Sequence, residues 1–195
     1  IIPFTFLLVE PKKHKQNKLK KSFKAIWQVV KFSLVENKTL KWLIILSSSI
    51  GFSTLSLAWF AQPYFKSIDM PLKYFGFAWA FLNLTTGFSS INAYRMQGLF
   101  SKNSFLILLS LGISIPIFLL SKSTAILGLI LITTVYIVRG LATPIMRTYI
   151  NDLTPSNMRA TVLSIRSFCI RVTFALMAPL MGWIVDVYSL GQSFL

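Results

Sequence analysis

Residues 42–64 read WLIILSSSIGFSTLSLAWFAQPY, a stretch of 23 residues that contains no charged side chain. The hydrocarbon core of a bilayer is about 30 Å thick, so about 20 helical residues at roughly 1.5 Å each cross it. Four later stretches meet, approach or exceed that length: residues 74–94, 103–121, 123–149 and 158–185. We therefore expect an all-α integral membrane protein, with a multi-pass bundle of five helices over residues 42–188.

Basic residues are concentrated just before this bundle. Residues 10–41 hold ten of the chain's 20 Lys and Arg residues and two acids, and the net charge of the chain is +15. Because loops rich in Lys and Arg stay in the cytoplasm, we expect this central loop to be cytoplasmic, in a plasma membrane or bacterial inner membrane. Such a charge raises the question of nucleic acid in a soluble protein. Beside a membrane helix, anionic lipid headgroups are the expected partner instead.

Apolar side chains recur at spacings of three and four within residues 10–41. This spacing predicts an amphipathic helix that lies on the cytoplasmic leaflet, and a site for a regulatory partner is the alternative. Most of the nearby lysines fall off the apolar face, which consists of Leu19, Phe23, Ile26, Trp27, Val30 and Leu34.

The two ends of the chain indicate a fragment of a longer protein. Residues 1–9 are apolar but too short to span a bilayer, and they begin with Ile1 and not with Met. We interpret them as the end of a truncated transmembrane helix. Residues 189–195 follow the last expected helix directly, and we interpret them as the link to a missing last helix.

The scarcity of cysteine and histidine excludes several kinds of chemistry. Cys169 and His14 are the single cysteine and histidine of the chain, so it offers no intrachain disulfide, no zinc site built on these residues and no Ser-His-Asp triad. The sequence also has no Gly-rich phosphate loop of the Walker type. We expect no enzyme activity, no metal and no cofactor.

Small and polar side chains line one face of four of the five expected helices, if residues three or four apart are taken as neighbours. Small residues also allow close helix packing, so packing is favoured over a cavity for the Ser, Gly and Ala positions. The helix at residues 103–121 lacks such a face and is expected to face lipid. The four faces are Ser47, Gly51, Thr54, Ala58 and Gln62; Trp79, Asn83, Thr86, Ser90 and Ala93; Thr133, Tyr136, Arg139, Thr143 and Arg147; and Ser164, Ser167, Arg171, Ala175, Ala178 and Gly182.

Arginines inside the expected spans point to function, because a charge at the centre of a membrane helix costs about 2.5–3.5 kcal/mol. Arg139 and Arg171 are expected near mid-membrane on successive helices. Arg166 lies about 140° around the helix from Arg171, so we expect it to extend toward the cytoplasm and not to share the same cavity face. No Asp or Glu lies within a span. The two central arginines must therefore meet acids elsewhere in the protein, backbone carbonyls or an anionic substrate.

The loop between the last two expected helices reads TPSNMRATVLS over residues 154–164. A Pro shortly before an Arg, with small residues after it, resembles the loop between helices ten and eleven of major facilitator superfamily transporters. Gly182 and Asp186 resemble the end of helix eleven in the same family. Residues 95–102 depart from the family, because they contain no Asp beside their Gly and basic residues. As a whole, the chain resembles the C-terminal half of such a transporter, its second six-helix bundle.

The resemblance implies secondary active transport of a small solute by alternating access, through a cavity shared with a missing N-terminal half. An anionic solute and protons are candidate cargo, and proton coupling would use carboxylates of that other half. We expect Arg139 and Arg171 as charge contacts in the cavity. Asn83 and Tyr136 are expected as hydrogen-bond contacts, with Gln62 at the outer mouth. The residues expected to act in the conformational change are Pro155, Arg159 and Asp186.

Two other classes of protein stay open. A receptor or scaffold derived from a transporter would bind a ligand without moving it across the membrane. An intramembrane enzyme that modifies lipids would need a cluster of acids, bases or metal ligands, and the expected spans have none.

Overall fold

The structure is a computed structural model of the chain, and it describes residues 23–123 and 125–187. Every regular element within these ranges is helical, so the predicted all-α class is confirmed. A single π-helical turn (Phe32–Glu36) follows α2, and a 3₁₀ turn (Leu72–Tyr74) precedes α4. The α-helices are α2 (Phe23–Lys31), α3 (Lys38–Ser67), α4 (Phe75–Gly98), α5 (Lys102–Leu120), α6 (Ala125–Asp152) and α7 (Arg159–Val187).

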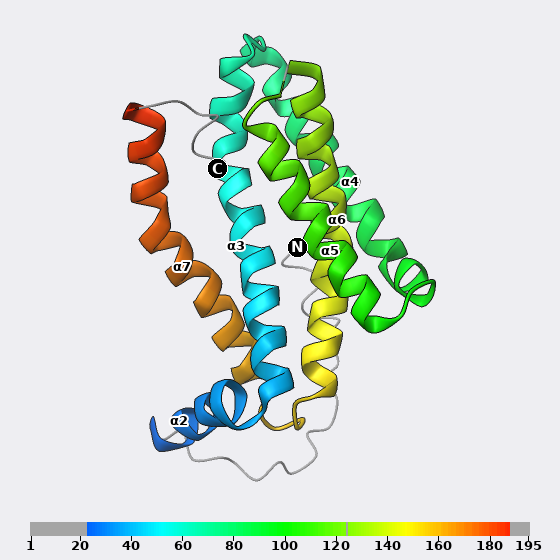
Figure 1. The fold of residues 1–195 in the computed structure, drawn as a ribbon, viewed down its shortest axis with the longest axis vertical. Coiled ribbons are helices and arrows are strands. Elements are labelled where there is room, and N and C mark those ends of the chain that lie inside the picture. The colour runs from blue at the N-terminus through cyan, green and yellow to red at the C-terminus, as the bar shows by residue number, and fades with distance from the viewer. Residues whose placement is uncertain (1–22, 124, 188–195) are drawn as a thin grey trace, which may run out of the picture.

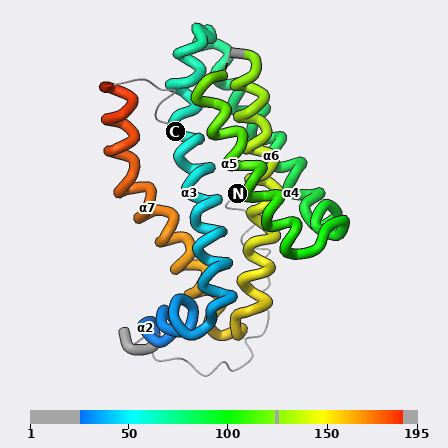
Figure 2. Tube along the Cα trace, in the orientation of Figure 1, coloured from blue at the N-terminus to red at the C-terminus, as the bar shows by residue number. Residues whose placement is uncertain are grey.

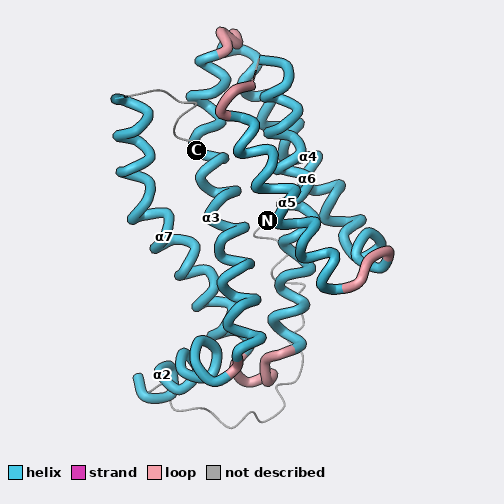
Figure 3. Tube along the Cα trace, viewed as in Figure 1, coloured by secondary structure: helices cyan, strands magenta, loops and turns pink. Residues whose placement is uncertain are grey.

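The five long helices form an antiparallel bundle with short links (Figures 1 and 3). Helices α3, α5 and α7 run in one direction and α4 and α6 in the other, as the colour gradient in Figure 2 shows. The α3–α4 and α5–α6 links lie at one end of the bundle. The α6–α7 link lies at the opposite end, beside α2, and this alternation matches the one expected of a multi-pass membrane protein.

Four helices are long and apolar enough to cross a membrane: α3, α5, α6 from Ile126, and α7. The remaining long helix, α4, was expected as a fifth span and has 24 residues, but it is not as apolar as the other four. Its polar side chains bond within the helix, since Asn83 Nδ2 and Thr85 Oγ1 donate to the carbonyls of Trp79 and Phe81, each at 2.8 Å. Such bonds lower the cost of polar groups in apolar surroundings.

Polar caps set two of the helix starts. Asn37 Oδ1 accepts a hydrogen bond from the Leu40 N–H at 3.0 Å, so α3 begins four residues before the apolar stretch at residue 42. Ser101 Oγ likewise accepts from the Ser104 N–H at 3.2 Å and starts α5 at Lys102. Both are residue types that cap helix N-termini well.

Helix α6 is the centre of the bundle and contacts α3, α4 and α5 extensively, but α7 only over a short stretch. At Gly140 the α4 backbone comes so close that an added Cβ would overlap the Thr86 carbonyl and lie 2.7 Å from Ser89 Cβ. Thr86 Oγ1 also donates to the Tyr136 carbonyl at 3.2 Å. Small and hydroxylated residues therefore serve close packing here.

Helix α7 packs against α3 near its first turns and diverges from it toward the other end (Figure 1). Val162, in the first turn, is its one buried residue. Further along, a Cβ added at Gly182 would meet nothing within 4 Å. The outer part of the predicted small-residue face of α7 is thus uncovered by the described residues.

The amphipathic helix predicted in the basic loop is present as α2 (Phe23–Lys31). Val29 faces the bundle and is buried, whereas Ile26 and Trp27 are 53% and 61% exposed. These two side chains are available for the predicted contact with lipid. Leu19, the rest of residues 10–22, and the predictions for residues 1–9 and 189–195 lie outside the described residues.

Candidate functional site

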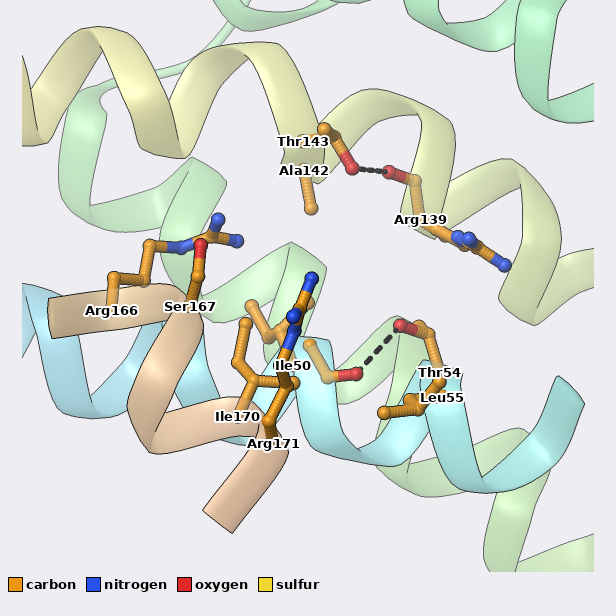
Figure 4. A pocket seen from close by; sticks show the side chains of 11 residues that line it. Ile50, Thr54, Leu55, Arg139, Ala142, Thr143, Arg166, Ser167, Ile170 and Arg171 are labelled. Carbon is orange, nitrogen blue, oxygen red and sulfur yellow. Dashed lines mark hydrogen bonds between the residues drawn. The ribbon is translucent and has the colours of Figure 1, made fainter. Parts of the chain in front are cut away.

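A cavity of about 240 Å³ lies between α3, α6 and α7 (Figure 4). Two other cavities, of about 210 and 300 Å³, are lined by no charged side chain. Of these three cavities, the first is therefore the one suited to a charged ligand. No acidic side chain from the described part of the chain lines it, and its polar lining consists of Thr54, Arg139, Thr143, Arg166, Ser167 and Arg171.

The cavity lies at half height in the bundle. Arg139 stands fourteen residues after the start of α6 and thirteen before its end, which is about 20 Å from either end. Thr54 is near the middle of α3 in the same way. The two arginines expected at mid-helix, Arg139 and Arg171, line this same cavity.

Arg166 also lines the cavity, which corrects the prediction that it would not share a cavity face with Arg171. Its Nε donates a hydrogen bond to Ser47 Oγ on α3. The prediction compared only the directions of the two residues around the helix. Because α7 faces the gap between α3 and α6, long side chains from two sides of α7 reach one wide cavity, as Figure 4 shows for Arg166 and Arg171. Arg166 directly precedes Ser167, a residue of the predicted polar face of α7. This neighbour was the signal in the sequence that could have placed Arg166 in the cavity.

Tyr136 lies behind Arg139 and not in the cavity. The Arg139 Cζ atom is 5.6 Å from the centre of the Tyr136 ring, within the range of a cation–π contact. Tyr136 is 1% exposed, and its ring meets Trp79 of α4 edge-on at 6.3 Å. Neither Tyr136 Oη nor Trp79 Nε1 has a hydrogen-bond partner among the described residues. The aromatic pair thus connects Arg139 to the packed α4–α6 interface.

The other two predicted cavity contacts lie apart from the arginines. Asn83 is exposed on α4, with its amide donating to its own helix. Gln62 is exposed near the end of α3. The structure does not place either of them in the cavity that holds Arg139, and their roles as solute contacts stay predictions.

The α6–α7 link is held by Arg159, whose Nε donates to the carbonyls of Asn151 and Thr154, each at 3.1 Å. Thr154 is 3% exposed, and its hydroxyl donates to the Ile150 carbonyl at 2.7 Å. The Pro155 carbonyl accepts from the Met158 N–H at 2.9 Å. These bonds tie the end of α6 to the start of α7. Asp186 is exposed near the far end of α7, away from this link.

A comparison of the chain with protein-family models found no match, and comparisons with curated proteins and with solved structures found none either. The resemblance to major facilitator transporters therefore rests on the sequence features given above. In the described residues there is also no group of three or more His, Cys, Asp or Glu side chains placed to hold a metal ion.

Proposed function

We propose that the chain is the C-terminal half of a secondary active transporter that resembles the major facilitator superfamily. In this proposal it moves a small solute across a plasma or bacterial inner membrane by alternating access. The loop at residues 10–41 is cytoplasmic and contacts anionic lipid headgroups. An N-terminal half supplies the other side of the cavity, and any proton coupling uses carboxylates of that half. The protein is not an enzyme.

One observation carries this proposal: three arginines line a cavity at mid-height between helices apolar enough to cross a membrane. A charged side chain at that depth is costly unless it faces water, a partner or a ligand. Ligand sites in transporters of this kind lie near the bilayer midplane, between groups of helices. A cavity lined by charges at this depth favours a solute pathway over a purely structural bundle.

The uneven packing of α7 adds support. Next to the cavity, α7 is close to α3, because a Cβ on Gly51 would lie 2.9 Å from Ile170 Cγ1. Its contact with α6 is short by comparison. A cavity bounded by a helix that packs firmly on one side and loosely on the other is suited to opening and closing.

Proteoliposomes containing the full-length protein test this function directly. We expect uptake or efflux of a solute from a broad panel, faster with an imposed proton gradient if the transporter is proton-coupled. Arg95→Gln is a suitable control variant, since Arg95 is exposed on α4 and outside the cavity. Solute binding without flux across the panel would contradict transport and favour the receptor or scaffold class.

A further inference from the structure

The three arginines of the cavity have no carboxylate partner in the described structure. Within residues 23–123 and 125–187 the one ion pair joins Lys31 to Glu36, 3.4 Å apart, beside α2 and outside the cavity. The chain has five acids in total. Four of them lie at helix ends or links, namely Glu36, Asp69, Asp152 and Asp186, and the fifth, Glu10, is outside the described residues. This chain thus offers almost nothing of its own to neutralise the cavity.

Most of the hydrogen-bond donors of these arginines are also unused. A guanidinium carries five N–H groups in a planar fork. Arg166 uses one of them on Ser47 Oγ. Arg139 Cζ lies 5.6 Å from the centre of the Tyr136 ring. Arg171 is exposed within the cavity lining, so the cavity presents many donors and a net positive charge.

The two threonine hydroxyls of the lining carry no charge of their own that could neutralise the arginines. Thr54 Oγ1 donates to the Gly51 carbonyl at 3.1 Å, and Thr143 Oγ1 donates to the Arg139 carbonyl at 2.8 Å. Both hydroxyl hydrogens are thus directed to the backbone of their own helices. The arginines remain the groups that determine which ligand is favoured.

The described helices enclose a small part of the cavity. About 240 Å³ corresponds to roughly eight water molecules at about 30 Å³ each. It is smaller than the cavities of about 300–1,000 Å³ that hold drug-sized ligands. A compact solute fits within the part of the cavity that α3, α6 and α7 enclose.

We propose that this cavity binds a small solute with at least two anionic groups, either carboxylates or phosphates. Arg139 on α6 and Arg166 and Arg171 on α7 hold those groups, because the guanidinium fork matches the oxygens of carboxylate and phosphate. Two or more negative charges are favoured over one because three cations line the space and no acid of the described residues does. The assignment of this solute as cargo rests on the proposed transport function, whereas its binding does not.

Titration calorimetry on the purified full-length protein in detergent tests the binding. The probes are succinate and pyrophosphate, with propionate as the monoanion and erythritol as the neutral compound. We expect at least one dianion to bind about tenfold or more tightly than propionate, and erythritol not to bind. Equal affinity for succinate, propionate and erythritol, or no binding of either succinate or pyrophosphate, overturns the proposal.

Variants identify the residues. Arg139→Gln and Arg171→Gln are each expected to weaken dianion binding by about tenfold or more, whereas Arg95→Gln removes the same charge from an exposed place on α4 and leaves binding unchanged. Arg171→Lys, which keeps the charge, should retain part of the affinity even if a Gln variant folds poorly. Unchanged binding in folded Arg139→Gln and Arg171→Gln would show that the anion binds elsewhere.

Flux of the same probes into proteoliposomes separates this inference from the proposed function. Dianion binding without flux would leave the site standing and remove transport. Flux of a neutral solute by a protein that binds no dianion would leave transport standing and remove the anion site. If carboxylates elsewhere in the protein neutralise the arginines, neither dianion binds, and the inference fails while transport is unaffected.

Discussion

Along α4 and α6, polar side chains lie within a close helix–helix contact, whereas along α6 and α7 they face a cavity. Thr86 and Gly140 bring the first pair of helices together, and Tyr94 Oη and Thr148 Oγ1 are hydrogen-bonded at 2.9 Å. On the second side, Arg139 and Arg171 line an open space with no acid from the described residues. The same kind of polar helix face thus serves packing in one place and lines a cavity in the other.

The α4–α6 contact and the cavity beside α7 are both polar, but they differ in the hydrogen-bond donors that their side chains carry. On the α4 side, hydroxyl and amide groups bond to backbone carbonyls within reach of their own helix. On the α7 side, each guanidinium group carries five N–H donors. These are more donors than the nearby backbone carbonyl oxygens can accept hydrogen bonds from. The α4–α6 pair is thus the closely packed part of the bundle, and the cavity beside α7 is the part to which we assign the proposed function.

The largest effect is expected from Arg139→Ala in the full-length protein. We expect loss of solute uptake, a reduction of about a hundredfold or more if the arginine holds the substrate charge, with normal membrane insertion. Uptake in proteoliposomes, normalised to inserted protein, measures it. Normal uptake by this variant would remove Arg139 from the site.

Gly140→Leu should be the most destabilising change in the α4–α6 interface. The new side chain has to displace the Thr86 backbone and Ser89, and overpacking of this kind costs about 1–3 kcal/mol or more. Thermal unfolding in detergent should show it as a lower melting temperature. The matched control is Gly87→Leu, because a Cβ at Gly87 meets nothing within 4 Å. Equal destabilisation by Gly140→Leu and Gly87→Leu would contradict the close contact between Gly140 and α4.

Arg159→Gln tests the link between α6 and α7. Two hydrogen bonds from one charged group to the carbonyls of Asn151 and Thr154 are lost, and since the site is exposed we expect about 1 kcal/mol. Faster hydrogen exchange of the backbone amides over residues 150–162 would report the loosened link. An exchange pattern identical to that of Arg95→Gln would mean that the link is held by other contacts.

The smallest effect is expected from Gly182→Ala on the uncovered part of α7. With nothing within 4 Å of the added Cβ, the change should stabilise the helix by up to about 1 kcal/mol through helix propensity alone. The melting temperature should stay level or rise slightly. A clear fall would show that α7 is packed at Gly182 in the full-length protein.

The helices themselves were predictable from the sequence, since long apolar stretches leave few alternatives to a helix in a bilayer. Their starts moved because Asn37 and Ser101 supply caps that lie outside the apolar stretches. The polarity of α4 was visible in Asn83 and Thr85, but the length of the stretch favoured a span equal to the others.

The composition of the cavity was only partly predictable. Arg139 and Arg171 stood out because charges are rare inside membrane helices. Arg166 was placed wrongly, since helical angles describe Cα directions and not the reach of a long side chain across the gap between α3 and α6. The position of α7 against α3 depends on packing between residues far apart in the sequence, such as Gly51 and Ile170, which no local pattern encodes.

Transport through the arginine cavity requires that water reaches this cavity inside the membrane, and thiol labelling measures that access directly. Thr143 lines the cavity and is exposed, so T143C in a Cys169→Ser background is labelled in vesicles with a charged, membrane-impermeant thiol reagent. We expect T143C to be labelled, whereas I115C, at an exposed position of α5 that is expected to face lipid, is not. If T143C stays as unreactive as I115C from both sides of the membrane, the cavity is not a solute pathway.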